Sequence, residues 1–497
     1  MNKKEVLEAI ENASNLRAAG KSAEAEIIYK NLVRANLRDA EVLTFVGAAY
    51  VSMNKLKKAK DCFERALNYN PLNPDFMINC AKIYYELGYF KKSKALFEKG
   101  VLKINNKSEC FYFLSLISEA EKKLEESVRY ILLCLDNPPF NIFYRKKALA
   151  LIDSLLSNYL DDGRWQDALR YVEISLRYFP SEDNLKITKA RCLCVQGNVV
   201  MGLKAFPKPN PDLTELKIPY WDGEINVSTK LLVRAEQGIG EQILFVTHLE
   251  SLKDKVGSLS VECDARLVNI LTQNFKDISF VPWSEPPHKE IIDHKFTSQV
   301  HMLKALSYVF DESLQKEKAK TQKLKNPMKN SSSIRKKFIG QDEKKIIGIS
   351  WFSANTPMAE KKTIPVGELI SIIPDNACII SLQYGIDRER AMDISKSLDG
   401  KLIFDEELDP LNDLDYFFDV VSACDLVICC SNSTAHVAGL LGVPCYVILS
   451  VNHNWHWFEE KSHSPWYPSV RLFRKERGEN WSPVLESVRT LLSSNFS

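Results

Sequence analysis

The sequence predicts an all-α helical-repeat array over residues 1–205 and an α/β region of parallel sheets over residues 206–497. Two observations predict this division. Small and aromatic residues recur every 34 positions in the first part, whereas short apolar runs alternate with helical segments in the second. A loop-like, Pro-rich stretch from Pro207 to Pro219 separates the two patterns and marks a domain boundary.

The repeat is carried by residues that bring two helices together. A small residue permits a close helix contact, and an aromatic residue four positions later fills the space beside it. These positions are Ala25, Ala59 and Ser93 for the small residues and Tyr29, Phe63 and Phe97 for the aromatic ones. The spacing resembles the tetratricopeptide (TPR) repeat, in which helix pairs stack into a solenoid.

The register continues to residue 205 with one insertion. Pro139 ends a fourth unit and Pro180 a fifth, 41 residues apart instead of 34, and a last helical pair passes through Arg191 and Gly197. Such an array buries a continuous core and leaves a concave groove. This groove either binds a peptide or partner protein or belongs to an oligomerisation scaffold, and the sequence leaves both readings open.

The composition excludes several classes of partner. The net charge is +2, from 66 basic and 64 acidic residues, so the protein as a whole has no strong electrostatic attraction to nucleic acid or to an acidic membrane. No apolar run is long enough for a transmembrane segment, and the charged N-terminus lacks a signal-peptide pattern, so a cytoplasmic location is expected. The 12 scattered cysteines are expected to be buried free thiols.

The α/β region is predicted to form two Rossmann-like lobes, residues 206–325 and 326–497, separated by a polar stretch at about residues 311–337. Lobes of this kind hold ligands at the carboxyl ends of their strands, which places a cleft between the two lobes. The predicted strands cover residues 230–235, 258–263 and 277–283 in the first lobe, and 346–351, 377–383, 401–404, 425–430 and 445–450 in the second.

A glycine-rich loop follows the first predicted strand. Gly238 and Gly240 let the backbone approach a ligand closely, but the third glycine of a dinucleotide fingerprint and the Lys-Ser/Thr pair of a P-loop are missing. Glu241, at the start of the next helix, is either a general base toward an acceptor hydroxyl or a charge that stabilises the helix dipole.

A second polar turn lies between a buried strand and a helix of small residues. It consists of Ser431, Asn432, Ser433 and Thr434. Hydroxyls, an amide and backbone N–H groups at a helix N-terminus form an anion site. His436, in the first turn of this helix, is placed to donate to a phosphate.

Aromatic side chains gather in the loop-rich segment 452–474. They form either a wall of the cleft or a core against the last helix. His453 and His456 lack the spacing of a helical zinc pair, and the acidic residues at 409–415 are expected to cap a helix, so no metal is predicted. The aromatic residues in question are Trp455, Trp457, Trp466 and Tyr467.

Several motifs stand in one order over about residues 221–482: WDG, LLVRAEQGIGEQILF, VECDARL, GISWFSAN with KKTIP, SLQYG, DLVICCSNSTAHVAGLLGVP and SPWYPSVRLFR. Together they resemble the bacterial TPR-containing glycosyltransferases related to the ADP-heptose:lipopolysaccharide heptosyltransferases. The resemblance implies the GT-B fold, with an acceptor-side first lobe and a second lobe that binds the nucleotide-sugar donor.

The resemblance also implies inverting, metal-independent glycosyl transfer that needs no cofactor. Glu241 stands where relatives carry the Asp that takes the acceptor's proton. Ser433, Thr434 and the helix N–H groups would bind the donor diphosphate, with His436 beside them.

Four further residues are assigned by the same resemblance. Ser431 and Asn432 stand where many relatives have Asp-Thr and so belong to the donor turn. Ser353 and Lys362 lie in a segment that resembles the loop meeting the phosphates, and Lys361 is an equally available cation.

The expected partners are a nucleotide-sugar donor, a glycan or protein acceptor, and a protein bound in the repeat groove. The alternative is a non-catalytic TPR adaptor that carries a degenerate glycosyltransferase domain, and the departures at Glu241, Ser431 and Asn432 keep this alternative open. The sequence does not identify the nucleotide base, the sugar or the acceptor.

Overall fold

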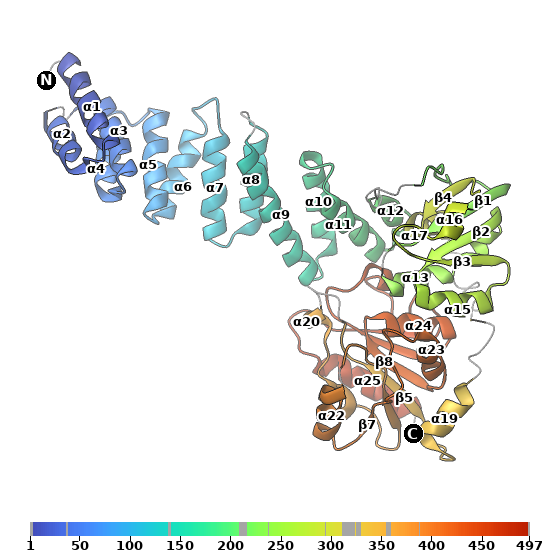
Figure 1. The fold of residues 1–497 in the computed structure, drawn as a ribbon. Helices are drawn as coiled ribbons and strands as arrows, with labels where there is room; N and C mark the ends of the chain where they lie inside the picture. Colours follow the sequence, from blue (N-terminus) through green and yellow to red (C-terminus); the bar gives the residue numbers. More distant parts are fainter. Residues whose placement is uncertain are drawn as a thin grey trace. The chain divides into compact units, whose positions relative to one another are not determined.

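The computed structural model describes residues 3–35, 38–137, 141–207, 216–236, 238–293, 295–310, 324, 330–353, 359–386 and 388–495. The chain folds into two compact units, Met1–Asn158 and Tyr159–Ser497. Figure 1 draws both units in the colours of the sequence. Helices make up the described part of the first unit, and the second contains the last repeat helices and two parallel sheets.

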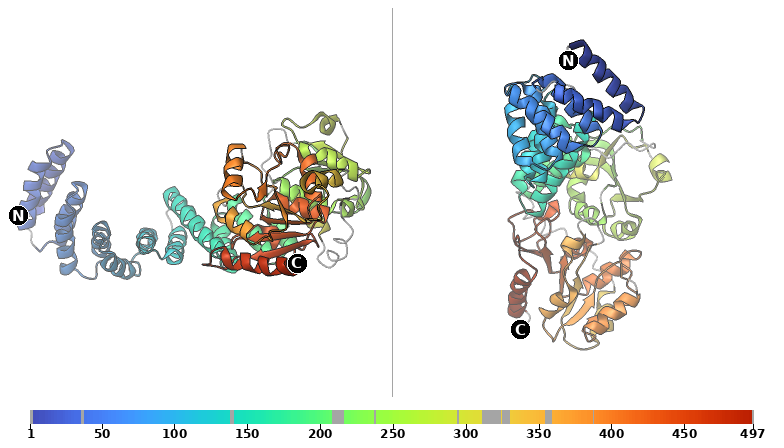
Figure 2. Two further views of the ribbon diagram at one scale, coloured as in Figure 1. Left: turned by 90° about the horizontal axis from the view of Figure 1, so that it is seen from below. Right: turned by 90° about the vertical axis from the view of Figure 1, so that its left-hand side faces the viewer.

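The repeat array consists of six consecutive helix pairs in the described part of residues 3–205. Figure 2 shows the pairs of the first unit from two further sides. The helices are α1 (Lys3–Ala18), α2 (Ser22–Ala35), α3 (Ala40–Ser52), α4 (Leu56–Tyr69), α5 (Pro74–Glu86), α6 (Phe90–Gly100), α7 (Ser108–Ala120), α8 (Leu124–Leu135), α9 (Ile142–Asp161), α10 (Trp165–Tyr178), α11 (Asp183–Val195) and α12 (Val199–Ala205).

Each helix pair turns at one residue in the left-handed conformation. The six residues have φ between 55° and 87° and are spaced by 34 residues, except for one step of 41. At each turn a backbone N–H closes onto a carbonyl five residues earlier, as Lys55 does onto Tyr50 at 2.8 Å. The repeat is therefore confirmed through all six pairs. The residues are Gly20, Asn54, Gly88, Lys122, Gly163 and Gly197.

The insertion lengthens one helix. Helices α3, α5, α7 and α11 each have 13 residues, whereas α9 has 20, so α9 alone accounts for the seven extra residues. Pro139, the predicted end of the fourth unit, lies outside the described residues.

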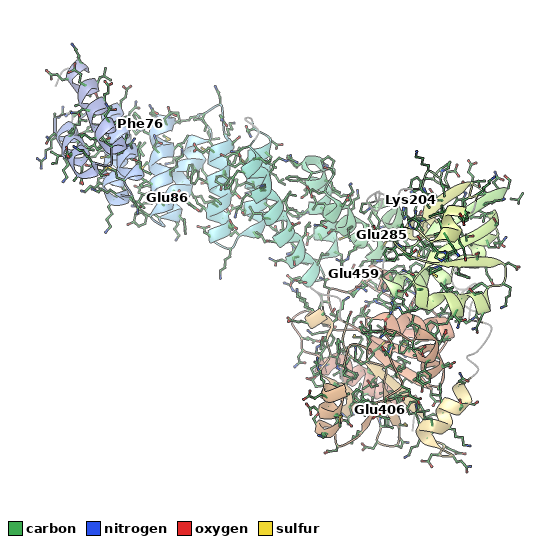
Figure 3. The ribbon with its side chains drawn as sticks, in the orientation of Figure 1. Phe76, Glu86, Lys204, Glu285, Glu406 and Glu459 are labelled. Carbon is green, nitrogen blue, oxygen red and sulfur yellow. The ribbon has the colours of Figure 1, made fainter. Side chains whose placement is uncertain are left out.

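The repeat positions pack as predicted. Ala25, Ala59 and Ser93 are completely buried. Gly47 lies so close to its partner helix that a Cβ there would stand 2.8 Å from Phe63 Cε1. Phe76, labelled in Figure 3, packs at the start of α5 against residues of the preceding pair.

The first sheet has four parallel strands in the order β3-β2-β1-β4. Three of them lie where apolar runs predicted strands, and β4, a short strand with polar residues, was not predicted. The strands are β1 (Asn226–Arg234), β2 (Val256–Cys263), β3 (Ile278–Pro282) and β4 (Ser298–His301), with helices α13 (Ile239–Val246), α14 (Leu249–Lys253), α15 (Ala265–Asn274), α16 (Lys289–Asp293) and α17 (Met302–Val309).

The second sheet has six parallel strands in the order β7-β6-β5-β8-β9-β10. Numbered from β5, this is the 3-2-1-4-5-6 order of doubly wound folds, whose strand order reverses between β5 and β8. The strands are β5 (Ile346–Ser350), β6 (Cys378–Ser381), β7 (Leu402–Ile403), β8 (Leu426–Cys430), β9 (Cys445–Leu449) and β10 (Val470–Arg474), and β10 was not predicted.

Helices cover both faces of this sheet. Helices α21 (Val366–Ser371) and α25 (Ser482–Asn495) pack on the face that carries Ile347 and Ile349. Helices α23 (Leu414–Ser422) and α24 (Ser433–Leu441) lie together, with α24 against β8 and β9. The remaining helices are α19 (Ser331–Ile339), α20 (Ala359–Lys362), α22 (Arg388–Ser397) and the 3₁₀ turn η1 (Trp455–Trp457).

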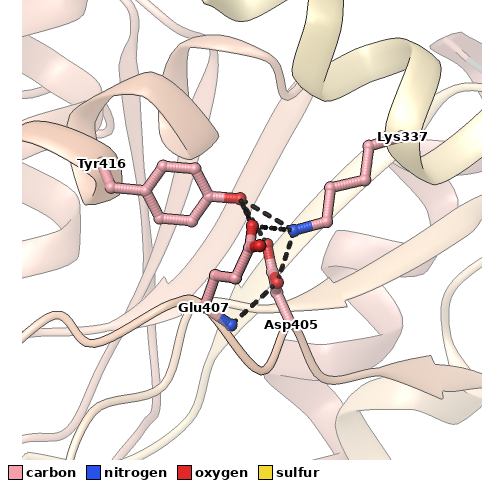
Figure 4. A network of polar contacts seen from close by, with 4 residues as sticks. All are labelled: Lys337, Asp405, Glu407 and Tyr416. Atoms are coloured by element: carbon pink, nitrogen blue, oxygen red, sulfur yellow. Dashed lines mark hydrogen bonds and ion pairs between the residues drawn. The ribbon is translucent and has the colours of Figure 1, made fainter.

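Helix α19 is fixed to the second sheet by a polar network, shown in Figure 4. Lys337 Nζ donates to Asp405 Oδ1 and Glu407 Oε2, both at 2.7 Å, and lies 3.0 Å from the Tyr416 hydroxyl. The C-terminal end of the predicted polar linker is therefore a docked helix. Most of the rest of that linker lies outside the described residues.

The predicted domain boundaries remain predictions. Helix α12 ends at Ala205, but the compact units divide at Asn158, because α11 and α12 pack against η1 and α17 within the second unit.

All 12 cysteines are buried free thiols, as predicted. Among the helices that the structure describes, none combines the length and hydropathy needed to cross a bilayer.

Candidate functional site

The loops after β5, β6 and β8 are tied together where the strand order of the second sheet reverses. The side-chain oxygen of Gln383 accepts hydrogen bonds from the backbone N–H groups of Trp351 and Phe352 at 2.8 and 3.0 Å. The amide of Asn432 donates to Ser350 Oγ at 2.7 Å and to the carbonyl of Phe352 at 3.1 Å. A ligand at this edge would meet a pre-organised backbone.

The start of α24 is capped from within. Asn432 is the N-cap residue, and its side-chain oxygen accepts from Thr434 N at 3.1 Å. Ser431 Oγ accepts from Trp457 Nε1 at 2.8 Å. Ser431 and Asn432 therefore hold the turn itself, whereas Ser433 is partly exposed.

Thr434 and Ser353 are both buried near this turn. The Thr434 hydroxyl is a buried polar atom without a hydrogen-bond partner among the described residues. An unpaired buried hydroxyl is unfavourable unless a ligand or water satisfies it. Of the four predicted donor-binding residues of this turn, Ser433 is the one that is partly exposed, and Ser431, Asn432 and Thr434 are buried.

His436 lies inside the protein with both ring nitrogens engaged. Nδ1 is 3.0 Å from the Tyr467 hydroxyl, and Nε2 is 3.1 Å from His456 Nε2. Its ring stacks on Trp457 with centroids 5.1 Å apart. Burial lowers the pKa of His436 to about 3, so the imidazole is neutral. Donation to a phosphate would require one of these contacts to break.

The glycine-rich loop reaches the same place. Helix α13 follows Gly238 and packs against α24. A Cβ at Gly240 would lie 2.9 Å from His436 Cδ2, so only glycine fits here. The structure thus brings Gly240 against His436 of α24, while the Glu241 carboxylate lies beside Gly238 at the start of its own helix, α13.

Glu241 faces a buried cation. Burial raises the pKa of Glu241, while a hydrogen bond from its own N–H and the charge of Lys362 act in the opposite direction. Lys362 is only 3% exposed and donates to Asn454 Oδ1 at 2.8 Å. Burial lowers the pKa of Lys362. Lys361 forms an ion pair with Asp161 instead, which favours Lys362 for the predicted phosphate contact.

The aromatic segment is a core. Trp455, Trp457, Trp466 and Tyr467 are all buried. Trp466 lies 5.7 Å from the ring of His248 and 5.1 Å from that of Phe310, which come from the first sheet's helices and their connections. The four aromatic residues therefore form a core, but the cited neighbours of Trp466 belong to the first sheet's helices and connections, whereas the sequence predicted a core against the last helix. The described residues contain no group of three or more possible metal ligands.

The sequence did not single out the residues that position this site. Asn454, which follows β9, holds Lys362 through its side-chain amide, and Gln383, which follows β6, holds the backbone after β5 in the same way. Asn452 connects the loop after β9 to Arg191. The only available signal was their position after apolar strands, at the carboxyl edge of a parallel sheet.

A cavity of about 240 Å³ lies between α12 and the first sheet. Glu236, which follows β1, lines it, and its Oε1 accepts from Leu303 N at 2.5 Å. Lys204, labelled in Figure 3, lies at the end of α12 and also lines the cavity. Burial raises the pKa of Glu236 to about 7.

Glu236→Gln is expected to stabilise the protein at pH 8 but not at pH 4.5. The pKa of Glu236 is about 7 in the folded state and 4.5 in the unfolded state. The wild type therefore loses up to about 3 kcal/mol of its free energy of unfolding as the pH rises through this window. Gln cannot ionise, and its amide oxygen can still accept from Leu303. The melting temperatures of both proteins across pH 4.5–8 test this, and a difference that does not change with pH would contradict it.

Comparison with known proteins identifies the repeats. Residues 40–71 match the tetratricopeptide repeat family. This short match covers α3 and α4, the second helix pair.

One curated relative, Protein FlbA of Caulobacter vibrioides, is 24% identical over 399 residues. The match covers 71% of this chain and 62% of the relative, so the chain spans less than two thirds of that protein.

Two of the similar solved structures each match only part of the chain. MamA from Desulfovibrio magneticus RS-1, residues 41 to the end, is 17% identical over 37% of this chain and 99% of its own, with a TM-score of 0.30. The first TPR domain of RPAP3 (Spaghetti), bound to the HSP90 peptide SRMEEVD, is 23% identical over 23% of this chain and 92% of its own, with a TM-score of 0.23.

Proposed function

We propose that this protein is an inverting, metal-independent glycosyltransferase of the GT-B type, which moves a sugar from a nucleotide-sugar to a glycan or protein acceptor. The observation that carries the proposal is the meeting of two loops. Gly240, next to Glu241, lies against His436 of α24, near the reversal of strand order in the second sheet, and the charge of the buried Lys362 acts on Glu241.

The chemistry follows from the charges. Glu241 accepts the proton of an acceptor hydroxyl as the oxygen attacks the anomeric carbon, and the bond from that carbon to the diphosphate breaks. Lys362 and the N–H groups at the start of α24 stabilise the charge on the leaving diphosphate. A base is most effective when its pKa lies near the working pH, and the raised pKa of Glu241 moves in that direction.

The helical repeats support a second role in the same protein. Arrays of this kind bind peptides and protein segments along their surface. We assign the repeats to binding of a protein partner or a protein acceptor.

Binding of a nucleotide-sugar tests the proposal. One of the UDP-, GDP- or ADP-sugars is expected to stabilise the protein by about 2.7 kcal/mol at 100 times its Kd, measured as a rise in melting temperature. Mass spectrometry then identifies the glycosylated acceptor. If none of these donors changes the melting temperature, the proposal fails.

A non-catalytic adaptor is the second candidate. It is favoured by His436, whose ring nitrogens are both held by other side chains, and by Ser431 and Asn432, which are used to build the turn. An adaptor would bind a protein partner through the repeats and bind no nucleotide-sugar.

A further inference from the structure

Three buried side chains form one hydrogen-bonded chain beside the candidate site. The Tyr467 hydroxyl lies 3.0 Å from His436 Nδ1, and His436 Nε2 lies 3.1 Å from His456 Nε2. All three residues are at most 3% exposed. His436 is in the first turn of α24, His456 is in η1, and Tyr467 lies in the segment between η1 and β10. We call this group the Tyr467–His436–His456 chain.

The chain holds one more hydrogen than its own hydrogen bonds can use. Burial lowers the pKa of His436 to about 3 and that of His456 well below its usual value, so both rings are neutral. A neutral imidazole carries one N–H and a tyrosine carries one O–H, which gives three hydrogens. Two of them lie in the two hydrogen bonds of the chain. The third therefore points outward, either from the Tyr467 oxygen or from His456 Nδ1.

The His456 end is a poor place for this hydrogen. His456 Nδ1 is enclosed by the protein and has no hydrogen-bond partner among the described residues. A buried N–H without an acceptor is rarer in proteins than a buried acceptor without a donor. The positive charge of Lys362 also acts on His456 and makes a further N–H there less favourable. The electrostatics thus favour a lone pair, and not a hydrogen, on His456 Nδ1.

The Tyr467 end lies near a negative charge instead. Burial and the charge of Glu241 raise the pKa of Tyr467 well above its usual value, so the hydroxyl keeps its hydrogen. Packing holds this end of the chain in place, because a Cβ at Gly439 would stand 2.4 Å from Tyr467 Cγ and a Cβ at Gly240 would stand 2.9 Å from His436 Cδ2. The outward hydrogen is therefore more stable on Tyr467, where the Glu241 carboxylate attracts it.

We propose that Tyr467 is a positioning residue for Glu241. His456 carries its hydrogen on Nε2 and donates to His436 Nε2, and His436 carries its hydrogen on Nδ1 and donates to the Tyr467 oxygen. The Tyr467 hydroxyl then turns its own hydrogen toward the Glu241 carboxylate and stabilises the ionised form, which is the form that accepts a proton. The catalytic consequence rests on the proposed function, whereas the arrangement of the hydrogens does not.

The tautomers of the two histidines test the arrangement of the hydrogens. In the full-length protein with isotope-labelled histidines, long-range proton–nitrogen NMR correlations at neutral pH distinguish a protonated ring nitrogen from an unprotonated one. The variants His436→Gln and His456→Gln assign the signals. We expect the hydrogen on Nε2 of His456 and on Nδ1 of His436. A hydrogen on Nδ1 of His456 would show that the chain runs in the opposite direction and would overturn the proposal.

Tyr467→Phe measures the effect on Glu241. The variant keeps the ring that packs against Gly439 but loses the hydroxyl. The pKa of Glu241 in the ligand-free protein, measured by NMR titration of the carboxyl carbons and assigned with Glu241→Gln, is expected to rise by about one pH unit. In the transfer reaction, the pH at half-maximal rate should rise by the same amount, while the Kd of the donor nucleotide should change by less than about twofold.

Tyr171→Phe is the matched control. Tyr171 lies on α10, where its ring is 5.6 Å from that of Tyr159, so this variant loses a hydroxyl outside the chain. The pKa of Glu241 should equal that of the wild type.

Each outcome supports or overturns the proposal. If the pKa of Glu241 is unchanged in Tyr467→Phe, or changes equally in Tyr171→Phe, Tyr467 does not act on Glu241 and the inference is wrong. If Tyr467→Phe does not fold, the tautomers of the wild type decide. If no nucleotide-sugar binds, the proposed function fails separately, because both NMR measurements use the ligand-free protein.

Discussion

Glu241→Gln is expected to reduce the rate of glycosyl transfer by about 10³-fold, in the range typical for the loss of a general base. Gln keeps the size of the side chain and can still accept a hydrogen bond, but it cannot take a proton. Because Glu241 is at the start of α13 and does not form the turn of α24, nucleotide binding should change by less than about twofold.

The measurement is the steady-state transfer rate together with the Kd of the donor nucleotide. Glu250→Gln, an exposed carboxylate on α14, is the control and should transfer at the wild-type rate. In the wild type, the rate should rise with pH through a pKa above the usual value for Glu, because burial raises the pKa of Glu241 and only the ionised form is a base. Unchanged turnover in Glu241→Gln would remove this residue from the mechanism.

Asn432→Ala is expected to destabilise the second unit by about 3 kcal/mol. Loss of the helix cap costs about 1 kcal/mol. The carbonyl of Phe352 and the hydroxyl of Ser350 would also lose their buried donor, which costs about 1 kcal/mol or more for each group. Chemical denaturation, followed by the fluorescence of the buried tryptophans, measures the loss.

Two companion variants separate the contributions to this loss. Asn432→Asp keeps the cap acceptor but places a carboxylate oxygen beside the carbonyl of Phe352, so it should remain substantially destabilising. Ser433→Ala, on the next and partly exposed residue, should change stability by less than about 0.5 kcal/mol. An Asn432→Ala protein as stable as the wild type would show that the loops after β5 and β8 do not depend on this amide.

The central strands of the second sheet were predicted because their side chains are buried on both faces. β5, β8 and β9 are buried at every residue, so they read as continuous apolar runs. β10 was missed because this edge strand carries two partly exposed arginines, Arg471 and Arg474, one on each of its faces. β4 has only four residues, and the polar residues at its ends hide the apolar run that predicts a buried strand.

The candidate site was predictable as a location but not as a set of contacts. A polar turn after a buried strand is visible locally, so the start of α24 could be found. The partners of His436 are 20 and 31 residues away, and Asn452 is 261 residues from Arg191. Nothing near these residues in the sequence signals such pairs, because tertiary packing brings them together.

The seven extra residues of α9 have a geometric consequence for the repeats. Seven residues make about 1.94 helical turns, so the insertion rotates the later part of the helix by only about 20° from its original phase. The buried stripe of α9 therefore runs unbroken through Ala148, Ile152, Leu155 and Tyr159. An insertion of five residues would have turned the stripe by about 140°, out of its packing face. Length changes in this helix are compatible with the stacking of its neighbours when they come in near-whole turns.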